Sequence, residues 1–567
     1  MRIGVKRTGV TLLGVVVLIL AGPAAANRLI GLAQLAGGQG CIAQPDEDAE
    51  AVRGCGRGRG LIDPSSVALS PDGESVYVAG SGSSAVAAFA RDRATGRLTQ
   101  RNCVSANGTS GVDGTKGACA DGNALSGATY VEVSPDGRFA YAASFDAGGI
   151  AIFERNETTG ALRQVGCVRP VRTCASARAL GGASAIALSP DGENAYVAAY
   201  DSNAVVMFER DVTTGLLRQL GCISDDGHDR LCTTGNALRG AAAVVVSADG
   251  RHVYVAAAES GAVLTFVRDV ETGVLTQRGC ILQDAPRRGS CTPGKGLGGP
   301  IALTLSPDNR TLFAASYVSD SIAVFARDAS TGNLRWIGCQ SEVFEEFEED
   351  EPDGCGHGGP LTSPTEIAVN RAGDRLYVSV ESGLTVLDRD LTTGALSVAG
   401  CLTYAAYWDD EVKKRCQHVT GIADASSVAL SPDEQNVYVT SWGSDAVTVL
   451  APGPTMSALR VSRRGLLSVR VTCPALHAGD CAGRMTFSPT APLRRLAQST
   501  SYRLSPGRTG IVHLHLSRPV MRALARWKTL AATIDAADAS RSLAPTRRAF
   551  VLRHRAAPTG ARPSPRR

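Results

Sequence analysis

The chain has 567 residues, a formal net charge of +4, 44% hydrophobic residues and 16 cysteines. Apart from one run near the N-terminus, no segment is long and apolar enough to supply the roughly 20 residues that cross a bilayer. The cysteines include no C-x-x-C pair and only eight histidines are present, which argues against structural zinc sites and against redox catalysis. We also expect no specific nucleic-acid recognition.

Residues 1–26 have the layout of a secretory signal peptide. Arg2, Lys6 and Arg7 precede an apolar stretch, and three small residues end at Ala26. This order predicts cleavage after Ala26. Retention of the segment as a membrane anchor is the alternative. We therefore expect a mature protein that is secreted or associated with the cell envelope.

One sequence motif occurs seven times in the next four hundred residues. It first reads "LSPDGESVYVAGS" at residues 69–81, and its copies are spaced by 55 to 64 residues. Repeats of this length exclude heptads and leucine-rich repeats, and they suit the four-stranded blades of a β-propeller.

Local chemistry predicts four strands in each copy. In the first copy, "SSVAL" ends at a Ser-Pro-Asp-Gly turn, and "SVYVAG" follows as a strand rich in β-branched and aromatic residues. "AVAAFARD" is the third strand, and a turn containing Gly96 leads to the fourth, "RLTQRNCV". Seven such units predict an all-β fold, a seven-bladed β-propeller over residues 27–453.

The last copy stops after its third strand, within residues 426–453. The missing fourth strand resembles the segment that begins the mature chain, "RLIGLAQLAGGQGCIAQ" at residues 28–44. We therefore predict that this N-terminal segment completes the last blade and closes the ring, which would cover an otherwise exposed strand edge.

The sixteen cysteines fall into neighbouring pairs within this frame. In an exported chain an even count indicates disulfides. Outer strands of different blades are too far apart for the separation of roughly 4.4–6.8 Å between Cα atoms that a disulfide needs. The predicted bridges are Cys41–Cys55, Cys103–Cys119, Cys167–Cys174, Cys222–Cys232, Cys280–Cys291, Cys339–Cys355, Cys401–Cys416 and Cys473–Cys481.

The repeats resemble the YVTN-type, lactonase-like β-propeller family, which includes 6-phosphogluconolactonase-like and carboxymuconate-cyclising enzymes. The resemblance covers residues 28–452 and is carried by "SPDG…VYVA" and "FERDxxTGxL". It implies histidine, arginine and acidic side chains at the central channel. No histidine precedes the inner strands, and Glu366 is the charged residue that we single out there. If the protein is an enzyme, Glu366 is the expected catalytic residue.

Residues 455–553 differ in composition and resemble a small bacterial immunoglobulin-like sandwich domain. Residues 518–530 predict a short helix, and residues 554–567 form a Pro- and Arg-rich tail that we expect to be disordered. From Ala451 onward the chain holds 20 Arg and 1 Lys against 3 Asp, a net charge of +18. This basic module predicts contact with anionic polymers, and an Arg-rich solubilising surface is the alternative.

The loops between the second and third strands of the blades are the predicted ligand site. Acids recur in them, and aromatic residues end the preceding strands. Rings beside hydrogen-bonding acids suit sugars or a cationic ligand, whereas ordinary turn formation is the competing explanation. The candidate residues are Asp146, Tyr200, Asp201, Glu259, Tyr317, Asp320, Glu381, Trp442 and Asp445.

The leading hypothesis for function is therefore non-catalytic recognition of an envelope glycan or protein at or outside the cell envelope. A lactone hydrolase of the propeller type is the alternative. We expect no cofactor. The acidic segment 345–350, with Glu351 and Asp353, could attract Ca²⁺, but it lacks the ordered spacing of a calcium loop.

Overall fold

The structure is a computed structural model of the chain. It describes residues 17–18, 32–35, 39–44, 52–110, 116–171, 173–225, 232–283, 291–342, 355–404, 412, 416–462, 465–473, 480–489, 493–527, 529–538 and 543–553. The acidic segment 345–350 and the predicted tail lie outside these residues, as does the signal segment apart from β1 (Val17–Leu18). In the described part no helix is long and apolar enough to span a membrane.

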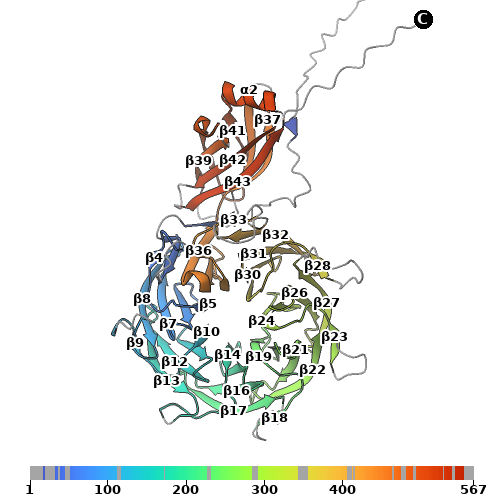
Figure 1. The fold of residues 1–567 in the computed structure, drawn as a ribbon. Helices are drawn as coiled ribbons and strands as arrows, with labels where there is room; N and C mark the ends of the chain where they lie inside the picture. Colours follow the sequence, from blue (N-terminus) through green and yellow to red (C-terminus); the bar gives the residue numbers. More distant parts are fainter. Residues whose placement is uncertain are drawn as a thin grey trace, which may run out of the picture. The chain divides into compact units, whose positions relative to one another are not determined.

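The chain divides into two compact units. One comprises Gln34–Ala451, and the other comprises Met1–Ala33 with Pro452–Arg567. The described residues of the larger unit form seven sheets (Figure 1). The innermost strand of each sheet contacts the innermost strand of the next sheet, and that of the last contacts that of the first. The sheets therefore form a closed ring.

Blade 1 shows how the repeat folds. Strands β5 (Pro64–Leu69), β6 (Ser75–Gly80), β7 (Ala85–Arg91) and β8 (Leu98–Ser105) pair antiparallel in chain order. A short fifth strand, β9 (Ala120–Asp121), pairs parallel with β8. The four long strands were predicted. The fifth strand was not, because two residues give no periodic signal.

The other blades repeat this order, and we number them in sequence. Their strands are β10 (Ala128–Val133), β11 (Phe139–Ser144), β12 (Gly149–Arg155) and β13 (Leu162–Val168) in blade 2; β14 (Ala183–Leu188), β15 (Asn194–Ala199), β16 (Ala204–Arg210), β17 (Leu217–Ser224) and β18 (Thr233–Thr234) in blade 3; β19 (Ala241–Val246), β20 (His252–Ala257), β21 (Ala262–Arg268), β22 (Leu275–Gln283) and β23 (Thr292–Gly294) in blade 4; β24 (Pro300–Leu305), β25 (Thr311–Ser316), β26 (Ser321–Arg327), β27 (Leu334–Ser341) and β28 (Cys355–His357) in blade 5; β29 (Glu366–Val369), β30 (Arg375–Val380), β31 (Gly383–Arg389), β32 (Leu396–Thr403) and β33 (Gln417–His418) in blade 6.

Blade 7 combines the two ends of the propeller sequence. Strands β34 (Ala425–Leu430), β35 (Val437–Ser441) and β36 (Ala446–Pro452) come from its C-terminal end. They are followed in the sheet by β3 (Cys41–Ala43) and β4 (Gly56–Arg57). β3 pairs antiparallel with β36, with Cys41 opposite Thr448. β2 (Leu32–Gln34) precedes β3 in the chain.

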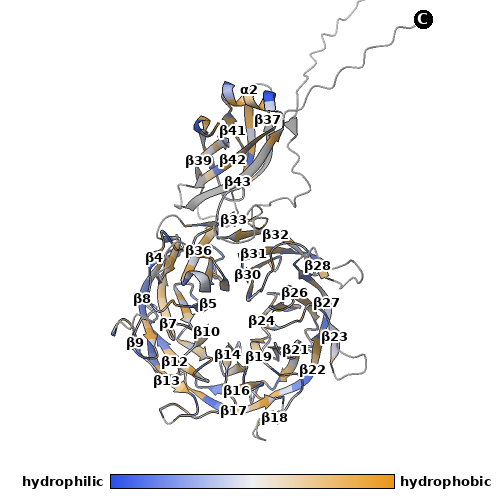
Figure 2. Ribbon diagram, in the orientation of Figure 1, coloured by the Kyte–Doolittle hydropathy of each residue, from blue (hydrophilic) through white to orange (hydrophobic). Residues whose placement is uncertain are grey.

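The second strands of the blades are buried on both faces because each blade packs against two neighbours. Every residue of β6, β11, β15, β20 and β25 is buried, which explains the apolar runs that Figure 2 shows along the blades. The propeller core therefore lies between the blades.

In blades 1 to 6 a buried arginine ends the third strand and bonds to the preceding blade, whereas the third strand of blade 7 ends at Pro452. Arg155 donates from Nη2 to Asp72 Oδ2 at 2.7 Å and from Nε to the Tyr77 hydroxyl oxygen at 2.9 Å. The Tyr77 hydroxyl in turn donates to the Gly160 carbonyl at 2.9 Å. We call this set the arginine latch. Its ion pairs are Arg91–Asp433, Arg155–Asp72, Arg210–Asp136, Arg268–Asp191 and Arg327–Asp249.

The latch is incomplete between blades 5 and 6. Phe313 stands where the other blades have a tyrosine, so the Nε of Arg389 has no hydroxyl to bond and lacks any partner among the described atoms. The guanidinium carbon lies 5.5 Å from the Phe313 ring centroid instead. Burial lowers the pKa of Arg389, with the Asp308 charge acting in the opposite direction.

All eight predicted disulfides are present, and the described cysteines include no free thiol. The seven bridges of the propeller have Cα–Cα separations of 4.3–4.9 Å. Each joins an outer strand to the loop that leads into the next blade, so neighbour pairing was correctly derived from the repeat frame. Eight disulfides fit an oxidising compartment.

The smaller unit contains two four-stranded sheets around one core. One sheet has the order β1, β37 (Thr455–Val461), β38 (Leu466–Thr472), β41 (Thr509–His515), and the other β40 (Gln498–Leu504), β39 (Cys481–Pro489), β42 (Thr529–Asp538), β43 (Leu543–Arg553). Buried residues from both sheets and from α2 (Arg518–Trp527) share this core. The helix ends three residues before the predicted boundary because β42 begins at Thr529.

Candidate functional site

Two carboxylates lie on the innermost strands of two blades that are not neighbours. Glu132 lies on β10 of blade 2 and Glu366 begins β29 of blade 6, and both side chains are half-buried. Each innermost strand contacts its two neighbours in the ring, and β10 and β29 are not such neighbours. The Glu366 charge nevertheless raises the pKa of Glu132, so this interaction acts across the ring.

Burial raises the pKa of both acids, and the Glu366 charge adds to the effect at Glu132. Burial, and then the Glu366 charge, raises the pKa of Glu132 to about 8. Burial raises the pKa of Glu366 to about 7, against the lowering effect of its hydrogen bond from the Ile367 N–H. Tyr130 joins them, because burial and both glutamates raise the pKa of its phenol well above the ordinary value. We call Tyr130, Glu132 and Glu366 the channel triad.

Glu366 was predicted from the sequence, whereas Glu132 was not. The segment "GATYVEVS" carried the signal, since its glutamate stands where the inner strands of other blades have Ala, Val or Thr. Paired carboxylates with raised pKa values can act as a general acid and a general base near neutral pH.

The predicted loop acids occupy two different structural positions. Asp146, Asp201 and Glu259 are exposed, and their side chains lie over a glycine of the preceding loop. A Cβ on Gly127 would stand 2.6 Å from Asp146 Oδ2, and one on Gly182 would stand 2.9 Å from Asp201 Cγ. Only glycine leaves room for these carboxylates.

In blades 1 and 7 the glycine lies in the loop between the second and third strands, and the acid lies in the loop before the first strand. There the preceding loop supplies the acid, Asp63 or Asp424, which lies over Gly82 or Gly443. Neither acid was predicted, because both lie in the loop before the first strand of the blade and the predicted acids lie in the loop between its second and third strands. Burial, and then the nearby Glu381 charge, raises the pKa of Asp424. We call the set the acid rim: Asp63, Asp146, Asp201, Glu259, Glu381 and Asp424.

Asp320 and Asp445 serve the backbone instead. Both have left-handed backbone angles, with φ of 46° and 44°. Asp320 Oδ1 accepts from the Ser363 N–H at 2.7 Å, and Asp445 Oδ1 accepts from the Asp63 N–H at 2.8 Å. These bonds connect one blade to the next. The structure thus separates these two predicted ligand residues from the acid rim.

The predicted aromatic residues differ in exposure and surroundings. Tyr317 and Trp442 are 43% and 38% exposed, and the Trp442 indole N–H donates to Ser65 Oγ at 3.3 Å. Tyr200 is half-buried, and its ring centroid lies 6.1 Å from that of Phe145. Burial, and then the Glu259 and Asp201 charges, raises the pKa of Tyr200.

A cavity of about 540 Å³ opens at the acid rim between blades 2 and 3. Phe145, Asp146, Asp201 and Arg178 are among its lining residues. The structure therefore brings two of the predicted acids to one cavity. The described residues hold no group of three or more His, Cys, Asp or Glu side chains that could bind a metal ion.

This closed ring of antiparallel sheets, whose innermost strands contact one another in turn, defines a β-propeller. The model of the family described as lactonase, 7-bladed beta-propeller, matches residues 64–225, 126–287 and 227–346. The chain belongs to this family of lactonase-like seven-bladed β-propellers.

The comparisons with individual proteins are more distant. No curated protein matches the chain. Among solved structures, a periplasmic gluconolactonase of Pseudomonas aeruginosa is 21% identical, with a TM-score of 0.42 over 59% of this chain and 84% of that one. A protein of Lactobacillus plantarum is 20% identical, with a TM-score of 0.43 over 59% and 83%. Hydrazine synthase of Kuenenia stuttgartiensis is 17% identical, with a TM-score of 0.43 over 69% and 96%.

Proposed function

We propose that this protein is an exported recognition module, whose acid rim binds a carbohydrate or a cationic group of a protein at the cell envelope or outside the cell. The cavity at Asp146 and Asp201 carries the proposal, because it combines exposed carboxylates with the Phe145 ring. Carboxylates accept hydrogen bonds from sugar hydroxyls, and ring faces pack on sugar faces.

In this proposal the chain has a signal peptide, a propeller and a C-terminal domain. A signal peptide at residues 1–26 directs export, and the N-terminal strand closes a seven-bladed ring. An immunoglobulin-like domain at residues 455–553 provides a basic surface for anionic polymers. The disulfides and the net charge of +18 from Ala451 onward support this plan.

Retention on purified cell-wall carbohydrate tests the rim. We expect Asp146→Ala/Asp201→Ala to weaken binding, and Tyr200→Ala or Trp442→Ala to weaken it by about 1–3 kcal/mol per aromatic, on the scale of side-chain burial. Asp121→Ala, on β9, and Trp527→Ala, on α2, are the matched controls. Equal retention of all variants would refute binding at the rim.

A second candidate function is lactone hydrolysis in the channel, which the channel triad favours. An ionised Glu366 would take a proton from the attacking water, and a protonated Glu132 would donate one to the leaving alkoxide. A lactone panel that includes 6-phosphogluconolactone tests this. Turnover that Glu132→Gln or Glu366→Gln abolishes, and that Tyr200→Ala/Trp442→Ala leaves intact, would rank the enzyme above the binding module.

A further inference from the structure

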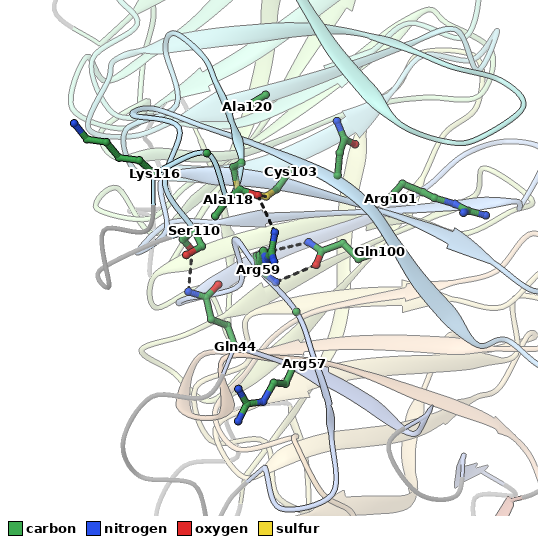
Figure 3. Close-up of a pocket in the computed structure, with 14 residues that line it drawn as sticks. Gln44, Arg57, Arg59, Gln100, Arg101, Cys103, Ser110, Lys116, Ala118 and Ala120 are labelled. Carbon is green, nitrogen blue, oxygen red and sulfur yellow. Dashed lines mark hydrogen bonds between the residues drawn. A yellow bond between two sulfur atoms is a disulfide. The ribbon is translucent and has the colours of Figure 1, made fainter.

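A second cavity lies on the outside of the ring, where blade 7 meets blade 1. Its volume is about 1060 Å³, and Arg57, Arg59, Arg101 and Lys116 are among the residues that line it (Figure 3). Among the described residues that line it, none is acidic. The described part of the lining therefore carries positive charges and no negative ones.

The uncharged polar side chains of this cavity are already engaged in the fold. Gln100 bonds both the N–H and the carbonyl of Arg59. Gln44 bonds the Ser110 carbonyl and the Leu61 N–H in the same manner. Asn102 likewise bonds the N–H and the carbonyl of Leu162. A ligand would therefore meet mainly cations.

These cations are free to bind a ligand. All four side chains belong to exposed residues, and none forms an ion pair with a described residue. Arg59 donates to the Ala118 carbonyl at 3.4 Å. The fold does not need the charges, since Val165, Leu220 and Ile337 take the place of Arg101 in blades 2, 3 and 5.

The direction of the side chains indicates the shape of the ligand. In Figure 3, Arg59 lies at the centre, while Lys116, Arg101 and Arg57 extend away from it in different directions. Charges spread in this manner suit a polymer with repeated negative charges better than one compact anion. The described residues of the lining include no aromatic ring, so they offer no platform for stacking the bases of a single-stranded nucleic acid.

We propose that this outer cavity binds an anionic polysaccharide. The site is separate from the acid rim and the channel triad, and it requires neither to function. Its binding would be electrostatic and would weaken as salt screens the charges.

Polygalacturonate binding by the full chain at low salt tests the proposal. We expect Arg57→Glu/Arg101→Glu to weaken binding by about tenfold. Each lost ion pair at an exposed side chain lowers the affinity by a modest factor, and the new carboxylates repel the anionic ligand. The control Arg251→Glu/Arg278→Glu makes the same charge change in blade 4, where Arg278 holds the strand position of Arg101. This control should bind polygalacturonate like the parent protein. It therefore distinguishes binding at the cavity from a general effect of net charge, including binding by the basic C-terminal region.

Galacturonate monomer, neutral dextran and single-stranded DNA complete the panel. We expect weak binding of all three. We also expect Lys116→Glu to lower the affinity for polygalacturonate relative to the parent, and to leave the binding of the other three unchanged. Equal loss in both double variants, no loss in either, or monomer or DNA binding as tight as that of polygalacturonate would overturn it. Equal melting temperatures of parent and variants establish that the fold is intact.

Discussion

Arg91 of blade 1 donates two hydrogen bonds from Nη2 to the carboxylate of Asp433 in blade 7, at 2.8 and 3.0 Å, across 342 positions of sequence. The same latch joins most of the other neighbouring blades. Arg91 also donates to the Tyr438 hydroxyl oxygen and to Asn436 Oδ1. The first and last blades are therefore held together by the interaction that the repeat uses elsewhere.

Asp433→Asn should destabilise the ring. The substitution leaves the buried Arg91 guanidinium without its counter-ion. We expect it to lower the free energy of unfolding by about 2–3 kcal/mol. This is less than the cost of breaking a fully buried ion pair, because Asp433 is partly exposed. Denaturant unfolding measures the change. Asp308→Asn is the matched control, since Asp308 holds the same turn position without an ion pair to Arg389. A control that is as unstable as the variant would contradict this role of the latch.

Phe313→Tyr should stabilise the protein. The new hydroxyl would meet the unpartnered Nε of Arg389 and reproduce the bond that Arg327 makes to Tyr254 at 2.7 Å. One buried hydrogen bond contributes about 1 kcal/mol. Tyr254→Phe is the reverse control and should destabilise by a similar amount. A lower unfolding midpoint for Phe313→Tyr would show that the space at this junction is too small.

The blades and the disulfides could be predicted because their determinants are local. The "SPDG" turns divide the strands, and each cysteine finds its partner within 7 to 16 residues. The exchange of Asp63 and Gly82 could not be predicted, because it depends on two loops meeting in space. Glu132 was missed for a related reason, since a glutamate within a strand gains meaning only when Glu366 faces it across the ring.

The channel triad makes stability depend on pH. The native state retains protons on Glu132 and Glu366 that the unfolded chain has released, so their stabilising effect is full below about pH 4.5 and is lost as the pH rises through about 7 to 8. Glu132→Gln/Glu366→Gln should therefore be more stable than the parent at pH 9, on the order of 1–2 kcal/mol after allowance for the partial exposure of both side chains. The two proteins should unfold alike at pH 4. A difference in the free energy of unfolding between the variant and the parent that grows toward low pH would contradict this prediction.

Asp445→Ala and Asp146→Ala should separate structural acids from rim acids. Asp445→Ala removes the acceptor for the Asp63 N–H and should cost about 1–2 kcal/mol of stability. Asp146→Ala removes an exposed carboxylate and should leave the melting temperature unchanged. Thermal unfolding of the two variants beside the parent checks this. Equal destabilisation would mean that Asp146 also has a structural role.

The pairing of β3 with β36 imposes an order of events during synthesis. β3 is made some four hundred residues before its partner, and the long chain between them must close into one loop. For a flexible chain this closure would cost about 5 kcal/mol of entropy. Preformed blades shorten the effective search, so the six intermediate sheets act as a scaffold that brings the two ends within reach. Until β36 pairs with it, β3 presents an open strand edge that other chains could occupy.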